Sequence, residues 1–515
     1  MNITKSLVLG SAAGFLAIGG VQAADLPVKA KAVEYVKVCS LYGAGFYYIP
    51  GTDTCIKLGG YLRVETALGT NSVYGWATGA SAGAHNQLSN WYTSRSRQDL
   101  NIDTRTATQY GVVRTYFDAA FTWTAGGYSA GGTNPNSTTY DGTNPAGTGS
   151  GQVGGGTLGV YYAFIQFAGF TMGKAVSQFS APWVNYPGNN FDGLVGGGGT
   201  VTGVNQFTYT AEFGNGVSVA LSAQDQVAYT QSALTNLSGI TQAGVQGGSY
   251  GANNIAGSRT PDFIAMLRVD QAWGLFQASF AAHNNTPGYY GAFETSGKPD
   301  DKWGWAAQLA LSIKNIPTGA GDTINVQGVY TDGATRYNIQ DLAPNAYSIY
   351  GGTSNPLNYG SIGFASAPDA VFTGTSAGNQ SQLENIKTWG FRGAYTHNWD
   401  PYWNTAIYGA YAGVSYGDLG KATICAALAN GGGAGQTGIT TCNPDFNIGQ
   451  VGIITRWTPV KNLTFSADFT WSHLDQKYAG VWNGAANNGA AKPAANYELK
   501  DQDSLTLLIR AQRNF

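Results

Sequence analysis

The sequence is poor in charged residues. Lys, Arg, Asp and Glu make up 11% of its 515 residues, whereas soluble domains usually carry about 25%. Basic and acidic residues number 27 and 29, which gives a net charge of −2. This balance provides no basic excess, so we expect no nucleic-acid partner. Apolar residues reach 43%, which is far more than a disordered chain contains.

The sequence also lacks long apolar runs and common catalytic motifs. After residue 23 no stretch of eighteen apolar residues occurs, so any membrane span must consist of strands. Stretches that match the G-x-S-x-G motif of hydrolases, such as 127–131 and 247–251, do not lie on a predicted strand-to-helix turn, so no nucleophile elbow is predicted. Gly154, Gly156 and Gly159 satisfy G-x-G-x-x-G, but they precede a predicted strand and do not open a helix. We expect no enzyme and no cofactor; a hydrolase that uses His283 or His473 is the alternative.

Cysteines are few and fall into two local pairs. Cys39 lies near Cys55, and Cys425 lies near Cys442. An even number of cysteines at matched short spacings predicts two disulfides, formed in an oxidising compartment. A zinc site would need closer C-x-x-C pairs or nearby histidines, and neither is present. We therefore predict no metal site.

The C-terminal residues alternate between apolar and polar side chains. One face carries Leu505, Leu507, Ile509, Ala511 and Phe515, and the other carries Ser504, Thr506, Arg510, Gln512 and Asn514. Period-two alternation predicts a strand with two different faces. A sheet that ended on such a strand would expose an edge, whereas a closed barrel pairs its last strand with its first. Arg513, on the apolar face, is expected at the level of the lipid headgroups.

The N-terminal residues have the composition of a secretory signal peptide. Lys5 provides a positive start, residues 7–20 are apolar, and Val21-Gln22-Ala23 fits the small-x-small cleavage pattern. We predict cleavage after residue 23, an N-terminal segment 24–58 that contains the first cysteine pair, and a barrel over 59–515.

About sixteen alternating segments follow, joined by connections that are by turns long and short. The predicted strands are 59–68, 97–108, 111–123, 159–168, 170–177, 204–214, 216–226, 262–271, 274–284, 302–315, 322–334, 387–399, 403–417, 446–459, 463–478 and 502–515. Bacterial outer-membrane barrels have an even number of strands, short periplasmic turns and long external loops. The predicted fold is therefore an all-β, 16-stranded antiparallel transmembrane β-barrel; a soluble sandwich with ragged loops is the alternative.

Charged residues of the first strands share one parity. Arg63, Arg95, Arg97, Arg105 and Arg114 alternate with apolar residues such as Leu62, Leu100 and Val113. A charge that faces lipid at mid-depth costs about 2–4 kcal/mol, so these arginines are predicted to line the lumen. The alternative is a solvated charged face without a special role.

The third long connection, 178–203, is the expected counterpart of these arginines. A 16-stranded barrel leaves room for a loop to fold inward and narrow the channel. Its acidic residue Asp192, and more weakly Glu212, would then oppose the arginines. Opposed charges would set a transverse field and influence ion preference.

Three stretches carry a specific resemblance. Residues 36–61 (VKVCSLYGAGFYYIPGTDTCIKLGGY), 163–174 (AFIQFAGFTMGK) and 510–515 (RAQRNF) resemble the general porins of alphaproteobacteria of the rhizobial type. The similarity covers essentially all of the mature chain, with the loops matched least. It implies a trimeric, sixteen-stranded, water-filled pore in the outer membrane for passive diffusion of small hydrophilic solutes and ions. It also implies an inward third loop, which maps to 178–203.

Two other functions remain open within this fold. A channel selective for sugars or oligosaccharides is one, and an adhesin-like surface barrel is the other. Conductance in planar bilayers separates a pore from an adhesin or an enzyme. Besides solutes, the expected partners are two further copies of the chain and outer-membrane lipid or lipopolysaccharide.

Overall fold

The computed structural model describes residues 37–71, 91–124, 157–183, 193–197, 203–226, 230–339, 345–376, 378, 380–429, 438–487 and 491–515. The predicted signal peptide and Asp192 lie outside these ranges. Among the described residues, no helix is long and apolar enough to cross a membrane.

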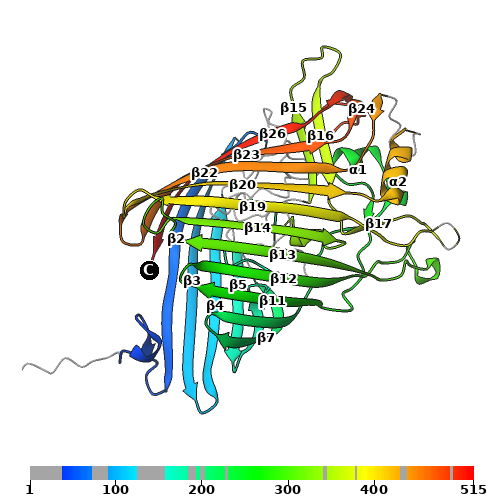
Figure 1. Cartoon of the computed structure of the whole chain (residues 1–515). Helices are drawn as coiled ribbons and strands as arrows, with labels where there is room; N and C mark the ends of the chain where they lie inside the picture. The colour runs from blue at the N-terminus through cyan, green and yellow to red at the C-terminus, as the bar shows by residue number, and fades with distance from the viewer. Residues whose placement is uncertain are drawn as a thin grey trace, which may run out of the picture.

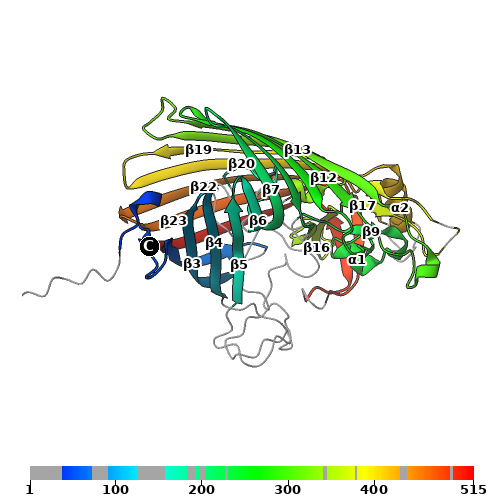
Figure 2. The same ribbon diagram turned by 90° about the horizontal axis from the view of Figure 1, so that it is seen from below.

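Antiparallel strands form a closed ring (Figures 1 and 2). The main sheet has 17 strands, of which the two-residue β1 (Tyr47–Tyr48) is only an addition to β2, so the ring itself has sixteen. These are β2 (Thr54–Gly69), β3 (Tyr92–Thr108), β4 (Gly111–Thr124), β5 (Thr157–Phe167), β6 (Phe170–Ala175), β7 (Val204–Gly214), β8 (Val217–Gln224), β11 (Asp262–Gln271), β12 (Gly274–Asn285), β13 (Lys302–Lys314), β14 (Thr323–Asp332), β19 (Lys387–Asn398), β20 (Trp403–Ser415), β22 (Phe446–Val460), β23 (Leu463–Gln476) and β26 (Gln502–Asn514). The predicted fold class is confirmed.

The ring closes between its last and first strands. β26 pairs with β2 from Asn514, opposite Tyr61, to Thr506, opposite Gly69. The strand predicted to begin at 59 begins at Thr54, so Cys55 is already part of the wall. Closure leaves no unpaired edge, which is what a barrel in lipid requires.

Side chains on the wall follow the predicted alternation. On the outer face Leu62, Leu309 and Ile509 are 50%, 60% and 52% exposed. On the inner face Gln277 and Thr470 are almost completely buried. Apolar groups therefore face outward and polar groups face the lumen.

The two ends of the barrel differ, also as predicted. At one end the connections are short; between β5 and β6, for example, only Ala168 and Gly169 intervene, both with positive φ. Two consecutive positive φ values are typical of the tight hairpin turns that match strand twist. The C-terminus and the N-terminal segment lie at this short-turn end (Figure 1).

The long connections contain regular structure of their own. Although they are rich in Gly and Asn, parts of them fold into two small sheets. One sheet contains β9 (Leu234–Asn236), β10 (Ala252–Asn253), β17 (Ala370–Phe372) and β18 (Glu384–Asn385); the other contains β15 (Ala346–Gly351), β16 (Gly360–Ser366), β21 (Ile439–Thr441), β24 (Ala479–Gly484) and β25 (Ala495–Leu499). Helices α1 (Gln242–Gln246) and α2 (Asp418–Ala429), with the 3₁₀ turns η4 (Leu237–Gly239), η5 (Glu294–Ser296) and η6 (Thr335–Tyr337), complete this end, while η2 (Ser40–Tyr42) lies in the N-terminal segment.

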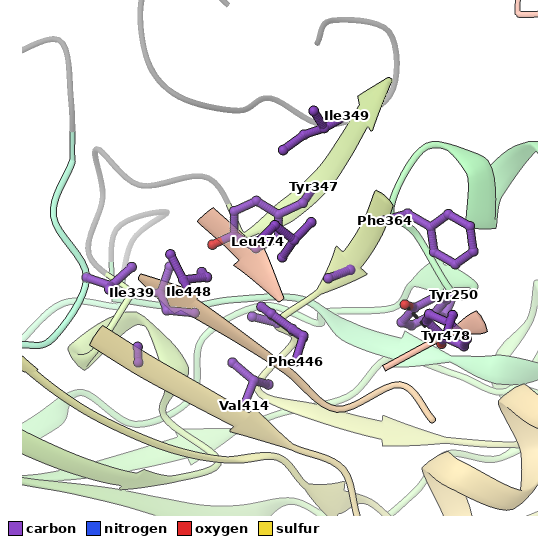
Figure 3. Packing of buried hydrophobic residues seen from close by; sticks show 14 of the residues in the cluster. Tyr250, Ile339, Tyr347, Ile349, Phe364, Val414, Phe446, Ile448, Leu474 and Tyr478 are labelled. Carbon is purple, nitrogen blue, oxygen red and sulfur yellow. Dashed lines mark hydrogen bonds between the residues drawn. The ribbon is translucent and has the colours of Figure 1, made fainter. Parts of the chain in front are cut away.

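We call the described parts of 230–261, 335–386, 418–445 and 479–501 the cap. Its core is apolar: Ile349, Phe364 and Trp482 are completely buried. Figure 3 shows that cap residues such as Ile349 and Phe364 belong to the same buried cluster as the inner-wall residues Phe446 and Ile448. The short apolar runs within these Gly-rich segments therefore bury enough apolar surface to order the segments.

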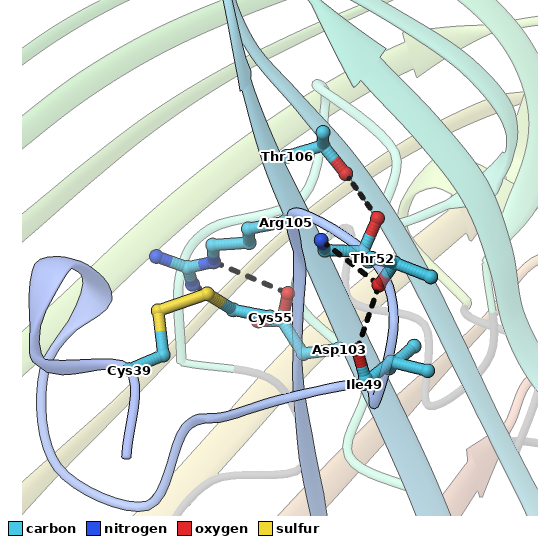
Figure 4. Close-up of a disulfide and its surroundings, with 8 residues drawn as sticks. Cys39, Ile49, Thr52, Cys55, Asp103, Arg105 and Thr106 are labelled. Carbon is cyan, nitrogen blue, oxygen red and sulfur yellow. Dashed lines mark hydrogen bonds and ion pairs between the residues drawn. A yellow bond between two sulfur atoms is a disulfide. The ribbon is translucent and has the colours of Figure 1, made fainter. Parts of the chain in front are cut away.

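Both predicted disulfides are present. Cys39 is bonded to Cys55, with a Cα–Cα distance of 6.1 Å, and Cys425 to Cys442, with 5.7 Å. The first ties the N-terminal segment to β2 (Figure 4). The second ties α2 to the residues that follow β21.

Phe364→Ala tests whether the cap is an independent packed unit. Loss of a buried Phe costs about 3–5 kcal/mol, so we expect proteases to cleave the cap of this variant. The barrel should still migrate as a folded, heat-modifiable band. Phe391→Ala, which removes an exposed outer-face ring, is the matched control and should leave cleavage unchanged. If the cap of the Phe364 variant resisted proteolysis like the wild type, its core would not hold it together.

Candidate functional site

The strands beside the closure bring several arginines together on the lumenal wall. Arg63 on β2 lies opposite Arg97 on β3, and Glu65 lies between Arg95 on β3 and Arg510 on β26. These residues alternate along β2 with Leu62 and Val64, which are exposed on the outer face. We call Arg63, Arg95, Arg97 and Arg510, with Glu65, the arginine cluster.

The cluster has more positive than negative charge. Both oxygens of the Glu65 carboxylate accept hydrogen bonds, one from Arg95 Nε and the other, at 2.7 Å, from Arg510 Nε. Arg63 Nε donates to Gln512 Oε1 at 2.7 Å and Arg97 Nε donates to Thr122 Oγ1 at 3.1 Å. Two guanidinium groups are thus paired with one carboxylate, while the other two are held by neutral acceptors.

Two further carboxyl groups lie closer to the short-turn end. Asp99 is opposite Tyr61, and Asp118 is opposite Asn101. Both are buried, and Tyr116 Oη donates to Asp118 Oδ2 at 3.3 Å. The lumenal wall therefore changes from cationic at the arginine cluster to acidic at Asp99 and Asp118.

Arg105 and Arg114 form a separate group at the short-turn mouth. They lie opposite each other, and both bind Asp103, at 2.9 Å and 3.0 Å. The Arg105 guanidinium also lies over the ring of Phe46, 4.8 Å from its centroid. Figure 4 shows Arg105 and Asp103 beside the Cys39–Cys55 disulfide. The five arginines singled out in the sequence thus occupy two levels of the wall.

The described parts of the third long connection lie against the lumenal wall at two places. Residues 178–183 contact β12 and β13, across the ring from the arginine cluster, and residues 193–197 contact β19 and β22, nearer to the closure. Glutamine amides of β12, β13 and β22 hold the backbone of the connection. Gln277 Nε2 donates to the Ser180 carbonyl at 3.0 Å, and Gln308 Nε2 donates to the Phe179 carbonyl at 2.8 Å. Gln450 Oε1 accepts from the Val195 N–H at 2.9 Å.

Close packing accompanies these hydrogen bonds. Phe179 is buried among wall residues and its ring meets that of Tyr337 at 4.6 Å. A Cβ on Gly196 would come within 2.3 Å of the Phe391 carbonyl oxygen. The backbone here can lie so near β19 only because the residue is glycine.

Two acidic residues, Asp192 and Glu212, were proposed to oppose the arginines. Asp192 lies outside the described residues, and Glu212 lies far from the third long connection. β7 leaves the loop at Val204 and ends at Gly214, beside the short turn, so exposed Glu212 is at the short-turn end. The structure therefore does not bring Glu212 next to 178–203.

Sequence reasoning missed the glutamines. Each of the residues Gln277, Gln308, Gln327 and Gln450 has the inward parity of its strand and is buried. Buried inward glutamines recurring on several strands mark a wall that binds backbone, because an amide both donates and accepts. That signal was present in the sequence.

The sequence pattern of the family described as "Porin subfamily" matches residues 25–508, which is most of the chain. The chain belongs to this porin family. Its outer-membrane channel function and its location follow from that membership, together with the apolar outer face and polar lumen.

Relatives agree with this assignment. The porin is 31% identical over 351 residues to Porin Omp2b of Brucella canis, a match that covers 64% of this chain and 85% of the relative. It is 29% identical over 349 residues to Porin Omp2b of Brucella neotomae, with the same coverage.

A solved structure shares the fold. The outer-membrane channel DcaP of Acinetobacter baumannii superposes with a TM-score of 0.51 at 15% identity, covering 91% of this porin and 99% of that chain. Such low identity supports the barrel fold alone.

Gln308→Leu together with Gln450→Leu tests how the third connection is held. Each change removes hydrogen bonds to buried loop backbone, a loss of about 1–3 kcal/mol per unsatisfied group. We expect chymotrypsin to cut within 178–203, which is rich in aromatic residues, in the variant and not in the wild type. Gln271→Leu is the control, because Gln271 donates only to the Asn215 carbonyl at a short turn. Equal resistance of both proteins would show that these amides do not anchor the segment.

Proposed function

We propose that this porin forms a water-filled pore through which small hydrophilic solutes and ions diffuse passively. The observation that carries the proposal is the closed ring with an apolar exterior and a polar, charged lumen. We propose further that the chain is exported with residues 1–23 as a cleaved signal peptide. Enzymatic activity is not part of the proposal.

The narrowest part of the pore lies, in this proposal, between the arginine cluster and the segment 178–203. The support is that residues 178–183 lie across the ring from the cluster, against β12 and β13, and that residues 193–197 lie against β22, two strands from β26. Arg63, Arg95 and Arg97 then act at the constriction, with Asp192 as the proposed opposing charge. Arg105 and Arg114 act at the periplasmic mouth, where they attract anions before entry.

We propose that three copies assemble in the membrane, as the resemblance to general porins implies, and that the remaining outer surface contacts lipid and lipopolysaccharide. The exposed apolar residues of the outer face suit either neighbour. A channel selective for one class of solute is the second candidate, because aromatic rings accompany the lumenal arginines. A conductance measurement separates a channel of either type, which passes current, from an adhesin-like barrel, which does not.

Purified, refolded porin should give stepwise ohmic conductance in planar bilayers. The reason is that a polar lumen in a closed barrel leaves a continuous path for hydrated ions. The oligomer should dissociate on heating in detergent, which gives an independent sign that the protein is folded. Absence of conductance from a heat-modifiable oligomer would refute the pore.

The double variant Arg63→Gln, Arg97→Gln tests the proposed constriction. It removes two charges and leaves Glu65 paired with Arg95 and Arg510. A charge about 8 Å from an ion in water contributes about 0.5 kcal/mol, so removal of two charges favours a cation and disfavours an anion by about 1 kcal/mol each. The cation-to-anion permeability ratio should therefore shift about thirtyfold toward cations.

Reversal potentials in a low-salt gradient measure this shift. It should shrink in molar salt, where the Debye length is about 3 Å. Arg105→Gln with Arg114→Gln removes the same charge at the mouth and should give a smaller shift. An unchanged potential in the first variant would place Arg63 and Arg97 outside the narrow part.

A further inference from the structure

Aromatic rings accompany the arginine cluster along the lumenal wall. The Arg63 guanidinium lies 4.4 Å from the centroid of Tyr61, and that of Arg97 lies 5.7 Å from the centroid of Tyr161. Both tyrosines are only partly buried. Stacking of this kind fixes a planar guanidinium and leaves its N–H edge to bind another group.

A break in strand register adds a ring to this surface. Asp118 pairs with Tyr162 and the next residue, Ala119, pairs with Val160, so Tyr161 is an extra residue in β5. Tyr161 approaches Arg97, and Tyr162 lies 6.3 Å from the ring of Tyr116. Two consecutive tyrosines therefore contact lumenal residues, which a regular strand would not allow. Bulges of this type commonly redirect a side chain at a functional site.

The cluster also contains donors without acceptors. Arg63 is 7% exposed and the Arg510 side chain is 10% exposed. Within the described part of the chain, Arg63 Nη1 and Arg510 Nη2 have no hydrogen-bond partner. The two residues lie on adjacent strands, because Arg63 is opposite Gln512 and Glu65 is opposite Arg510. Buried cationic donors of this kind call for an anionic acceptor.

We propose that this part of the wall is a binding site for a carboxylate borne on a six-membered ring, as in an aromatic acid or a sugar acid. The proposal rests on the pore function proposed above and narrows its solutes. On binding, the Arg63 and Arg510 guanidinium groups turn toward the lumen, so that Arg63 Nη1 and Arg510 Nη2 donate hydrogen bonds to the carboxylate, and the ring lies against Tyr61 and Tyr161. A small inorganic anion would satisfy the donors but would leave the tyrosine faces unused.

The charge pattern of the wall fits this orientation. Asp99 and Asp118 lie on the short-turn side of the cluster, so the carboxylate is repelled there and attracted to the guanidinium groups. A solute with its charge at one end and a ring at the other is thereby oriented. Binding must be weak enough to allow release, as in any conducting pore.

The test is inhibition of KCl conductance by benzoate, glucuronate and acetate, which all carry one carboxylate. At least one of the ring acids should half-inhibit the current at a concentration at least tenfold below that of acetate. Inhibition by benzoate alone assigns the site to aromatic acids, and inhibition by glucuronate alone assigns it to sugar acids. Both results support the proposal. Equal concentrations for all three acids would overturn it.

Single variants separate the contribution of the tyrosine ring to binding from that of the arginine charge. Tyr161→Leu should raise the half-inhibiting concentration of the ring acid about tenfold and leave that of acetate unchanged. Tyr209→Leu removes an outer-face tyrosine that is 48% exposed and should have no effect on either acid. Arg63→Gln should weaken inhibition by both. If Tyr161→Leu and Tyr209→Leu behaved alike, the aromatic part of the site would be refuted.

Calorimetric titration of the folded oligomer in detergent with benzoate and glucuronate measures binding without current. If the protein conducts KCl but ring acids inhibit the current no better than acetate, the proposed binding site is refuted and the proposed pore function stands. Heat from a ring acid that Tyr161→Leu abolishes, in a protein without conductance, would support the site and refute the pore.

Discussion

Everything in this porin depends on the hydrogen-bonded closure between β26 and β2. In lipid a strand edge would leave its N–H and C=O groups unpaired, at a cost of several kcal/mol each. Nine residue pairs, from Tyr61 with Asn514 to Gly69 with Thr506, remove that edge. Once the ring is closed, the period of two divides every strand into a lipid face and a lumenal face.

The closure also assembles the proposed site. Glu65 of the first wall strand lies between Arg510 of the last and Arg95 of the next, so residues about 450 positions apart in sequence form one charged group. Glutamines of β12 and β13, across the ring, and of β22, two strands from β26, hold the third connection by its backbone. The wall at the closure is thus charged and aromatic, while the wall from β12 to β22 binds the third connection. A solute path beside the closure is the natural consequence.

The alternation of residues within each strand was enough to predict which side chains face the lumen. It could not predict the register between strands or the tertiary packing of the long connections. The parity of Arg63 and Arg97 predicted their inward direction, since only one face can meet lipid. The separation of Arg105 and Arg114 from them depends on how far β2 and β3 extend beyond β26, which no local pattern shows. The same holds for Tyr161, which the register break in β5 redirects. The cap strands were missed because their apolar runs, such as 346–351, are short and become strands only by packing together.

The central claim is that the wall beside the closure faces a conducting lumen. The most direct test is Arg97→Cys, treated during single-channel recording with a charged methanethiosulfonate reagent, with Ile509→Cys on the outer face as the control. The account predicts a stepwise change in current for the Arg97 variant only, of opposite sign for cationic and anionic reagents. Complete labelling of that variant without any change in current would contradict it.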